Sequence, residues 1–89
     1  MKIKVIYKKL GREQAHGIAD SDGTVYLDPR LKGKKHCEIL LHECLHLLYP
    51  KDSEEAIIKK SVTLCKVLWA ENYRRIDNTN DEPLQDGSK

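Results

Sequence analysis

The sequence has no long hydrophobic run, no strong excess of either charge and no recognisable leader. Its apolar stretches fall well short of the roughly 20 residues that span a bilayer, so we expect no membrane segment. We also expect no signal peptide, because Met1 leads directly into a strand-like pattern. The net charge of +2 is too close to zero to indicate a nucleic-acid partner.

The cysteines of this chain do not form a disulfide pattern. There are three cysteines, an odd number, and they lack the spacing of a disulfide framework. Cys37, Cys44 and Cys65 all fall within segments that we predict to be helical. We therefore expect reduced thiols that pack as small core residues, which fits a cytoplasmic location.

The length of 89 residues suffices for one small domain, and the sequence contains no internal repeats. We predict a single domain over residues 1–76, followed by a disordered acidic tail over residues 77–89. The core of so small a domain is limited. A metal ion that ties two elements together would therefore help its stability.

Short β-prone segments occupy the first third of the chain. Partly alternating apolar residues predict a strand over residues 2–9. The turn sequence Asp20-Ser-Asp-Gly23 separates two further β-prone segments, 15–19 and 24–28, which we expect to pair as a hairpin. The predicted fold class is α+β, with a small antiparallel three-stranded sheet, one helix that carries the candidate site and a second long helix.

Two helices are predicted, over residues 34–48 and 54–75. Apolar residues cover nearly the whole circumference of the first helix, so we expect it to be central and buried, and Pro50 ends it. Asp52 or Ser53 is a suitable N-cap for the second helix, and Asp52-x-x-Glu55 has the form of a capping box.

The second helix has an apolar stripe that should face the first. We predict that this stripe consists of Ile58, Val62, Cys65 and Trp69, widened by Ile57, Ser61, Leu64 and Leu68.

The first helix contains the motif H-E-x-x-H, formed by His42, Glu43 and His46. Residues four apart lie on the same face of a helix, so both imidazoles can reach one metal ion. Glu43 lies about 100° further round the helix, where it can contact a water bound to the metal rather than the metal itself. This pattern is typical of zinc peptidases, in which the glutamate acts as general base.

A catalytic zinc site usually has a third protein ligand. The link after His46 is short, so it brings the start of the second helix, with Glu54 and Glu55, back beside it. With Ile58 at 0° and 100° per residue, the inward stripe centres between about −20° and −60°, Glu54 falls at about −40° and Glu55 at about +60°. The wheel favours Glu54 as ligand and leaves Glu55 for the capping box.

Four other polar residues are weaker candidates for the site. We expect His16, on a short strand, and His36, at the start of the first helix, to be surface histidines. Tyr49 and Tyr73 could stabilise an oxyanion, but we expect both to be packing residues.

The order of strand, hairpin, H-E-x-x-H helix and Ser53-Glu54-Glu55-Ala56 resembles the zincin metallopeptidases, over about residues 15 to 70. It is similar to the Glu-zincin branch, and in layout to small ImmA/IrrE-type peptidases and minimal H-E-x-x-H proteins of bacteriophages. The ImmA/IrrE pattern places its glutamate directly before Ala-Asn, which favours Glu55 because Ala56 follows it. Both glutamates therefore stay open as the third ligand.

The resemblance implies a minimal zincin-like fold and a zinc-dependent metallopeptidase with Glu43 as general base. Zinc is then the cofactor, and the substrate is a peptide or protein that lies along one strand of the predicted hairpin. No nucleic-acid or membrane partner is expected. The alternative is a non-catalytic zinc-binding module with a structural metal. The presence of Glu43 argues against this alternative, because a structural site needs no base beside its ligands.

Overall fold

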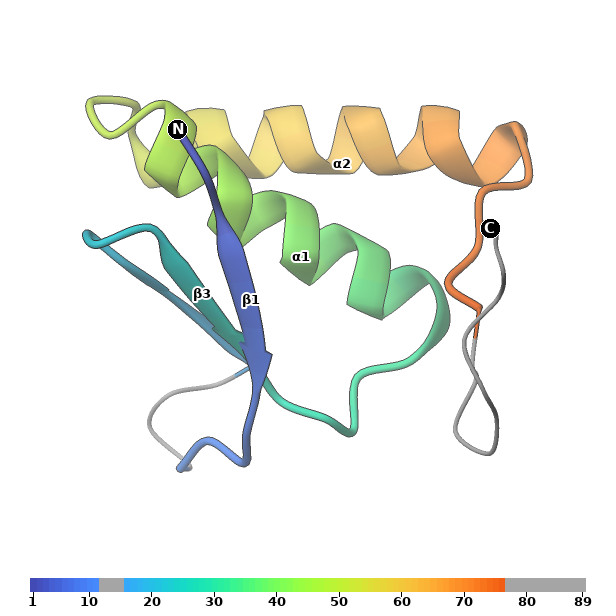
Figure 1. Ribbon diagram of the computed structural model, residues 1–89. Helices are drawn as coiled ribbons and strands as arrows, with labels where there is room; N and C mark the ends of the chain where they lie inside the picture. Colours follow the sequence, from blue (N-terminus) through green and yellow to red (C-terminus); the bar gives the residue numbers. More distant parts are fainter. Residues whose placement is uncertain (12–15, 77–89) are drawn as a thin grey trace.

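The computed structural model describes residues 1–11 and 16–76 and contains three strands and two helices (Figure 1). The predicted α+β class is confirmed. The predicted tail, 77–89, and Ala15, the first residue of a predicted strand, lie outside the described residues. The elements in chain order are β1 (Lys4–Tyr7), β2 (Gly17–Asp20), β3 (Thr24–Leu27), α1 (Gly33–Leu48) and α2 (Glu54–Ala70).

The sheet is mixed, so the prediction of an antiparallel sheet is wrong. Strands β2 and β3 form the predicted antiparallel hairpin, whereas β1 pairs with β3 in parallel. The order is β1-β3-β2. Strands β1 and β2 run in opposite directions, and β3 lies between them. Because β3 is antiparallel to β2, it runs parallel to β1. The physical reason for this order is burial: Val25 and Leu27 of β3 are fully buried, whereas β1, three of whose four residues are exposed, suits an edge.

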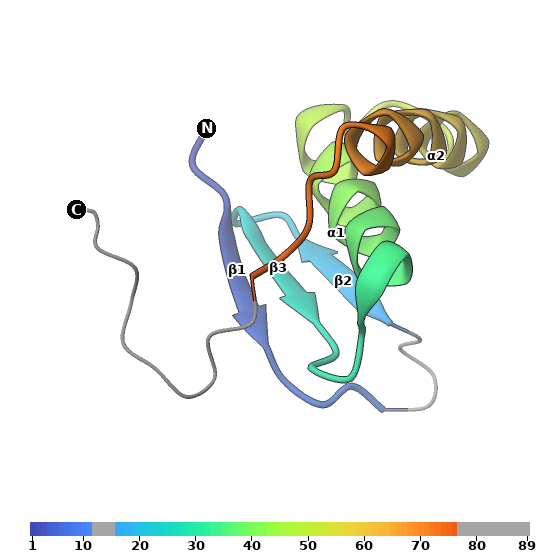
Figure 2. The ribbon, with the colours of Figure 1, turned by 90° about the vertical axis from the view of Figure 1, so that its right-hand side faces the viewer.

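Helix α1 covers one face of the sheet and lies between the sheet and α2 (Figure 2). Val25 and Leu27 point to α1, and in register with them Val5 and Tyr7 of β1 face the same side. Leu31, in the segment before α1, joins this core. Partly buried apolar residues that pack against it are Ile3, Ile39, Leu40, Cys44 and Leu47.

The central position predicted for α1 is confirmed, but its burial is lower than predicted. Of its residues only His36 and Leu45 are buried, and Leu48 is 52% exposed. A three-stranded sheet and one partner helix cannot enclose a whole helix, so part of the apolar circumference remains at the surface. Neither α1 nor α2 is both long and apolar enough to cross a membrane.

Helix α2 begins at Glu54 as predicted, but the predicted capping box is wrong. The N-cap is Ser53, whose hydroxyl accepts a hydrogen bond of 3.1 Å from the backbone N–H of Ala56. Asp52 instead forms an ion pair with Lys60 of α2, eight residues further along the chain. Glu55 therefore occupies the second helical position, where its side chain cannot close a capping box.

The end of α2 also differs from the prediction, because the helix stops at Ala70 and not at Arg75. Asn72 has a φ of 68°, a left-handed conformation that asparagine tolerates. Its N–H donates to the carbonyl of Trp69, and the N–H of Tyr73 donates to the carbonyl of Leu68. These two bonds form a Schellman motif, which ends the helix locally.

The inward face of α2 is rotated slightly from the predicted stripe. Ile57, Ser61 and Cys65 are buried, whereas Ile58 and Leu64 are 45% and 44% exposed. Ser61 is accommodated because its hydroxyl donates to the carbonyl of Ile58. The rotation is small enough that Glu54 remains on the side of α2 that faces α1.

The predicted reduced state of the cysteines agrees with the structure, in which Cys37, Cys44 and Cys65 are free thiols. Burial raises the pKa of Cys37 to about 11, with a further contribution from the neighbouring Cys65. Burial also raises the pKa of Cys44. Thiols with raised pKa values stay protonated at neutral pH and behave as small apolar core groups.

The revised cap leads to a test. We expect Ser53→Ala to lower the free energy of unfolding by about 1 kcal/mol, because the N–H of Ala56 loses its acceptor. Glu55→Ala serves as the matched control and should change stability by less than about 0.5 kcal/mol. Urea denaturation of both variants measures the difference. A larger loss of unfolding free energy for Glu55→Ala than for Ser53→Ala would indicate that the capping box forms after all.

Candidate metal centre

Three side chains converge where the end of α1 meets the start of α2. The Nε2 atoms of His42 and His46 are 3.2 Å apart. One carboxylate oxygen of Glu54 lies 3.0 Å from Nε2 of His42, and the other lies 2.9 Å from Nε2 of His46. One ligand atom of each side chain lies within 4.8 Å of the other two. We call these three residues the His-His-Glu cluster.

Local structure explains why these groups meet. The two histidines are one turn apart on α1, so their rings lie above one another. Helix α1 ends where the N–H of Tyr49 donates to the carbonyl of Leu45, and the chain turns where the N–H of Asp52 donates to the carbonyl of Tyr49. The Ser53 cap then starts α2 at once. The first helical residue after this turn is Glu54, beside the last turn of α1.

The geometry of the cluster fits a metal ion of zinc's size. Two nitrogen ligands at 2.0–2.1 Å from a tetrahedral zinc would be about 3.3 Å apart, close to the distance between the two Nε2 atoms. Imidazole nitrogen and carboxylate oxygen are ordinary zinc ligands. The side chains of His42 and His46 are 16% and 30% exposed, and that of Glu54 is 63% exposed. The cluster thus lies at the surface, where a bound ion would be open to water.

Glu43 lies next to the cluster without belonging to it. Its side chain lies against Gly17 of β2: a Cβ atom on that glycine would be 3.0 Å from Cγ of Glu43 and 3.2 Å from its Oε2. The same atom would be 3.0 Å from Ile39. Helix α1 therefore approaches β2 closely at a residue without a side chain, and the carboxylate of Glu43 is held between the helix and the sheet.

Burial raises the pKa of Glu43 above its ordinary value. The charge of Glu54 acts in the same direction, whereas His42 and His46 lower this pKa. A carboxylate with a raised pKa binds a proton more readily near neutral pH, as a general base must. The structure thus gives Glu43 surroundings that differ from those of a solvated surface glutamate.

The structure brings together three of the predicted metal ligands and leaves one out. His42, His46 and Glu54 form the cluster, whereas Glu55 is exposed on α2 and does not join it. The wheel placed Glu54 correctly on the inward face because the cap at Ser53 starts the helix in the expected register. The role of these residues as ligands stays a prediction.

Among the other candidates, His36 contradicts the expectation of a surface histidine. It is 6% exposed, and its Nε2 lies 2.9 Å from the hydroxyl of Tyr7. The reason is that α1 turns this residue toward β1. His16 is exposed as expected. Tyr49 lies under the amine of Lys60, at 4.1 Å from the ring centre, and Tyr73 is 65% exposed beyond the far end of α2.

Sequence reasoning did not identify Gly17. A glycine inside a β-prone segment signals close approach of another element, and this signal was present. It gave no indication of which element approaches, because the partner residues Ile39 and Glu43 lie on a helix far along the chain.

Comparisons with models of protein families, with curated proteins and with solved structures found no match to this chain. The resemblance to zincins therefore depends on the motif residues and their spacing, and membership of that family stays a prediction.

Two glycine substitutions test the contact between Glu43 and β2. Gly17→Ala should cost about 1–3 kcal/mol, because the new methyl group overpacks the space between β2 and α1. Gly11→Ala is the matched control: nothing lies within 4 Å of its Cβ position, so it should stay within about 0.5 kcal/mol of the parent. Thermal and urea unfolding measure both. Equal stability of the two variants would show that α1 does not approach Gly17 this closely.

Proposed function

We propose that this chain is a zinc-dependent peptidase. His42, His46 and Glu54 hold the zinc ion, and Glu43 acts as general base in the hydrolysis of a peptide bond. The observation that supports this most is the convergence of two Nε2 atoms, 3.2 Å apart, with a carboxylate from a second helix, beside a half-buried glutamate that is not part of the cluster.

Each residue of the chain has a defined task in this proposal. When bound, zinc would supply a water whose pKa is lowered to about 7 and an electrophile for the scissile carbonyl. Glu43 would accept a proton from the attacking water and would donate it to the leaving amine. The contact with Gly17 fixes the side chain of Glu43, so its carboxylate is positioned before the substrate binds.

The free edge of β2 offers a binding surface for an extended peptide. Strand β2 pairs with β3 on one side only. The N–H of Asp28 donates to the carbonyl of His16, so the backbone groups of His16 face β3. Every second residue of an antiparallel strand does the same, and Ile18 therefore also hydrogen-bonds to β3. Gly17 and Ala19 therefore direct their N–H and C=O groups away from β3. A peptide that pairs with these groups would pass beside Glu43.

A structural metal module is the second candidate. It is favoured by the fact that the cluster links α1 to α2 in a domain with a limited core. The two proposals share the same ligands and differ in whether Glu43 has a chemical task, so activity of a Glu43 variant separates them.

The ligand set can be tested by zinc titration. His46→Ala and Glu54→Ala should each weaken zinc binding by more than about 100-fold, which exceeds the usual cost of losing an outer-shell partner. Glu55→Ala removes the same group one residue further along and should keep the parent affinity. Calorimetry with chelator competition measures all three. The reverse order, with Glu55→Ala losing zinc and Glu54→Ala retaining it, would show that Glu55 is the ligand.

The role of Glu43 is tested by Glu43→Gln, with Glu55→Gln as the matched carboxylate-to-amide control. Glu43→Gln should retain zinc and fold but lower peptide cleavage by about 10²–10⁴-fold, because an amide cannot take the proton. New peptide termini, detected by mass spectrometry after incubation with a mixed peptide library, measure cleavage. Loss of zinc in Glu43→Gln would indicate that Glu43 is a zinc ligand. Unchanged cleavage would show that Glu43 is not the general base.

A further inference from the structure

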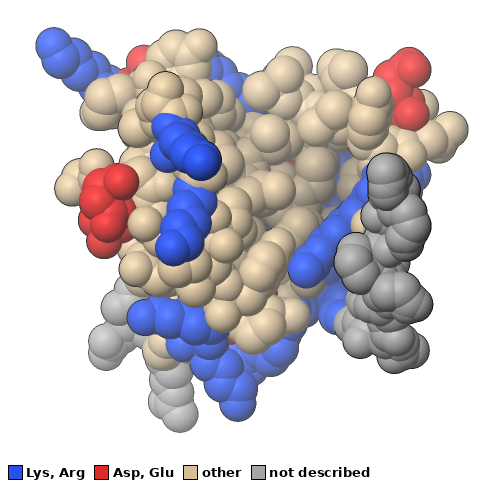
Figure 3. All heavy atoms as spheres, in the orientation of Figure 1, with Lys and Arg blue, Asp and Glu red and all other residues tan. Residues whose placement is uncertain are grey.

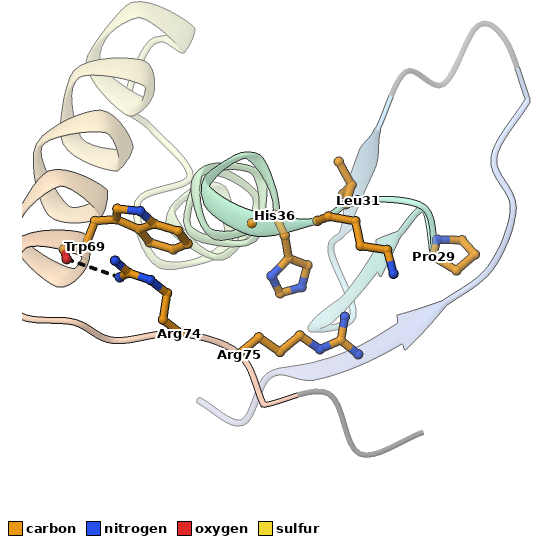
Figure 4. Close-up of a pocket in the computed structure, with 8 residues that line it drawn as sticks. Pro29, Leu31, His36, Trp69, Arg74 and Arg75 are labelled. Atoms are coloured by element: carbon orange, nitrogen blue, oxygen red, sulfur yellow. Dashed lines mark hydrogen bonds between the residues drawn. The ribbon is translucent and has the colours of Figure 1, made fainter. Parts of the chain in front are cut away.

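A cavity of about 280 Å³ lies at the other end of the helix pair from the His-His-Glu cluster. The segment that leads into α1, the first turn of α1 and the residues that end and follow α2 enclose it. Its lining contains three cationic side chains, those of Lys32, Arg74 and Arg75, and no carboxylate from the described residues. His36 and Trp69 contribute to its walls (Figure 4).

Aromatic rings hold both arginines in place. The guanidinium carbon of Arg74 lies 3.8 Å from the ring centre of Trp69, and one of its nitrogens donates to the carbonyls of Trp69 and Tyr73. The guanidinium carbon of Arg75 lies 4.6 Å from the ring centre of Tyr7. A guanidinium stacked by its face keeps the N–H groups at its edge available, so both forks are oriented before a ligand arrives.

Neither arginine has an acidic partner within residues 1–11 and 16–76. Arg30, by contrast, forms an ion pair with the carboxylate of Asp28 at 2.7 Å. Arg74 binds neutral carbonyls only, and Arg75 makes no ion pair with the described carboxylates. The positive charge at the cavity is therefore not neutralised by this part of the chain.

The start of α1 adds to the positive potential. Its N-cap, Lys32, provides no side-chain hydrogen bond, and its first turn contains no acidic residue. Lys34 and Lys35 follow, although a helix N-terminus favours negative charge. In Figure 3, lysine and arginine side chains are spread over much of the face, from its upper left to its lower edge, and acidic ones lie at its margins. An anion in the cavity would relieve this repulsion and accept bonds from free N–H groups.

His36 forms a polar wall of the cavity without adding charge. Its ring points from α1 toward Arg75 (Figure 4). Burial lowers the pKa of this histidine, and the charge of Arg75 lowers it further, so the ring is neutral at pH 7. Its contact with the hydroxyl of Tyr7 fixes the ring, and thereby links β1 to this wall.

We propose that this cavity binds the phosphate group of a small phosphate monoester. Three cations, two of them oriented guanidinium forks, offer more donors than one carboxylate can use, whereas phosphate has three or four oxygens to accept them. The exposed part of Trp69 provides an apolar surface for the organic part of the ligand. The limited volume favours a small molecule over a polymer. This inference does not depend on zinc or on peptidase activity.

Trp69 is the only tryptophan of the chain and lines the cavity, so its fluorescence reports on ligand binding there. We expect inorganic phosphate and phosphoserine to change its emission saturably at constant ionic strength. Arg75→Gln and Lys32→Gln should each weaken this binding by about tenfold or more. Both residues are exposed, so these variants should fold normally. Lys51→Gln, the same charge change at the other end of the helix pair, should bind like the parent.

His46→Ala separates this site from the proposed zinc site. Phosphate binding should be the same in His46→Ala as in the parent, whatever the outcome of the zinc titrations. Three results would overturn the proposal: a linear change that sodium chloride reproduces, equal weakening by Lys51→Gln and Arg75→Gln, or loss of binding in His46→Ala. Tighter binding of succinate than of phosphate would assign the cavity to carboxylates instead.

Discussion

The close packing of α1 against the sheet at Gly17 is the constraint on which the rest of the structure depends. Helix α1 has to cover Val25 and Leu27 on one side and accept α2 on the other. It can approach β2 closely only where the strand has no side chain. This approach fixes the rotation of α1, and the rotation decides which residues face the sheet edge and which face the start of α2. Glu43 faces the edge because His42 and His46 face α2.

Local sequence signals predicted the parts of the site that depend on one helix at a time. The spacing of His42 and His46 fixes their common face whatever surrounds the helix. The helical wheel favoured Glu54 over Glu55, although both stayed open as ligands, because the angle between a residue and the apolar stripe follows from helix periodicity alone. The parallel pairing of β1 with β3 could not be predicted, because strand order is set by burial across the whole sheet. The same holds for His36, whose burial depends on a β1 residue, Tyr7.

Two further differences came from local signals that compete with each other. Asp52 and Ser53 are both good caps, and the ion pair of Asp52 with Lys60 leaves Ser53 as the cap. The apolar pattern of α2 continues past Ala70, but Asn72 in a left-handed conformation ends the helix first. At this end of α2 a single polar residue outweighed a periodic pattern, because backbone groups at a helix end must find partners before side chains can pack.

The charges at the two ends of the helix pair have opposite relations to the helix dipoles. At one end Glu54 begins α2, where negative charge is favoured, and a cation held by His46 would lie at the C-terminal end of α1, where positive charge is favoured. At the other end, Arg74 binds carbonyls at the C-terminus of α2, but Lys32 and its neighbours oppose the dipole of α1. The His-His-Glu cluster thus lies where the C-terminus of α1 supports a metal cation. The cavity lies where the N-terminus of α1 and three cationic side chains attract an anion, and no described carboxylate supplies one.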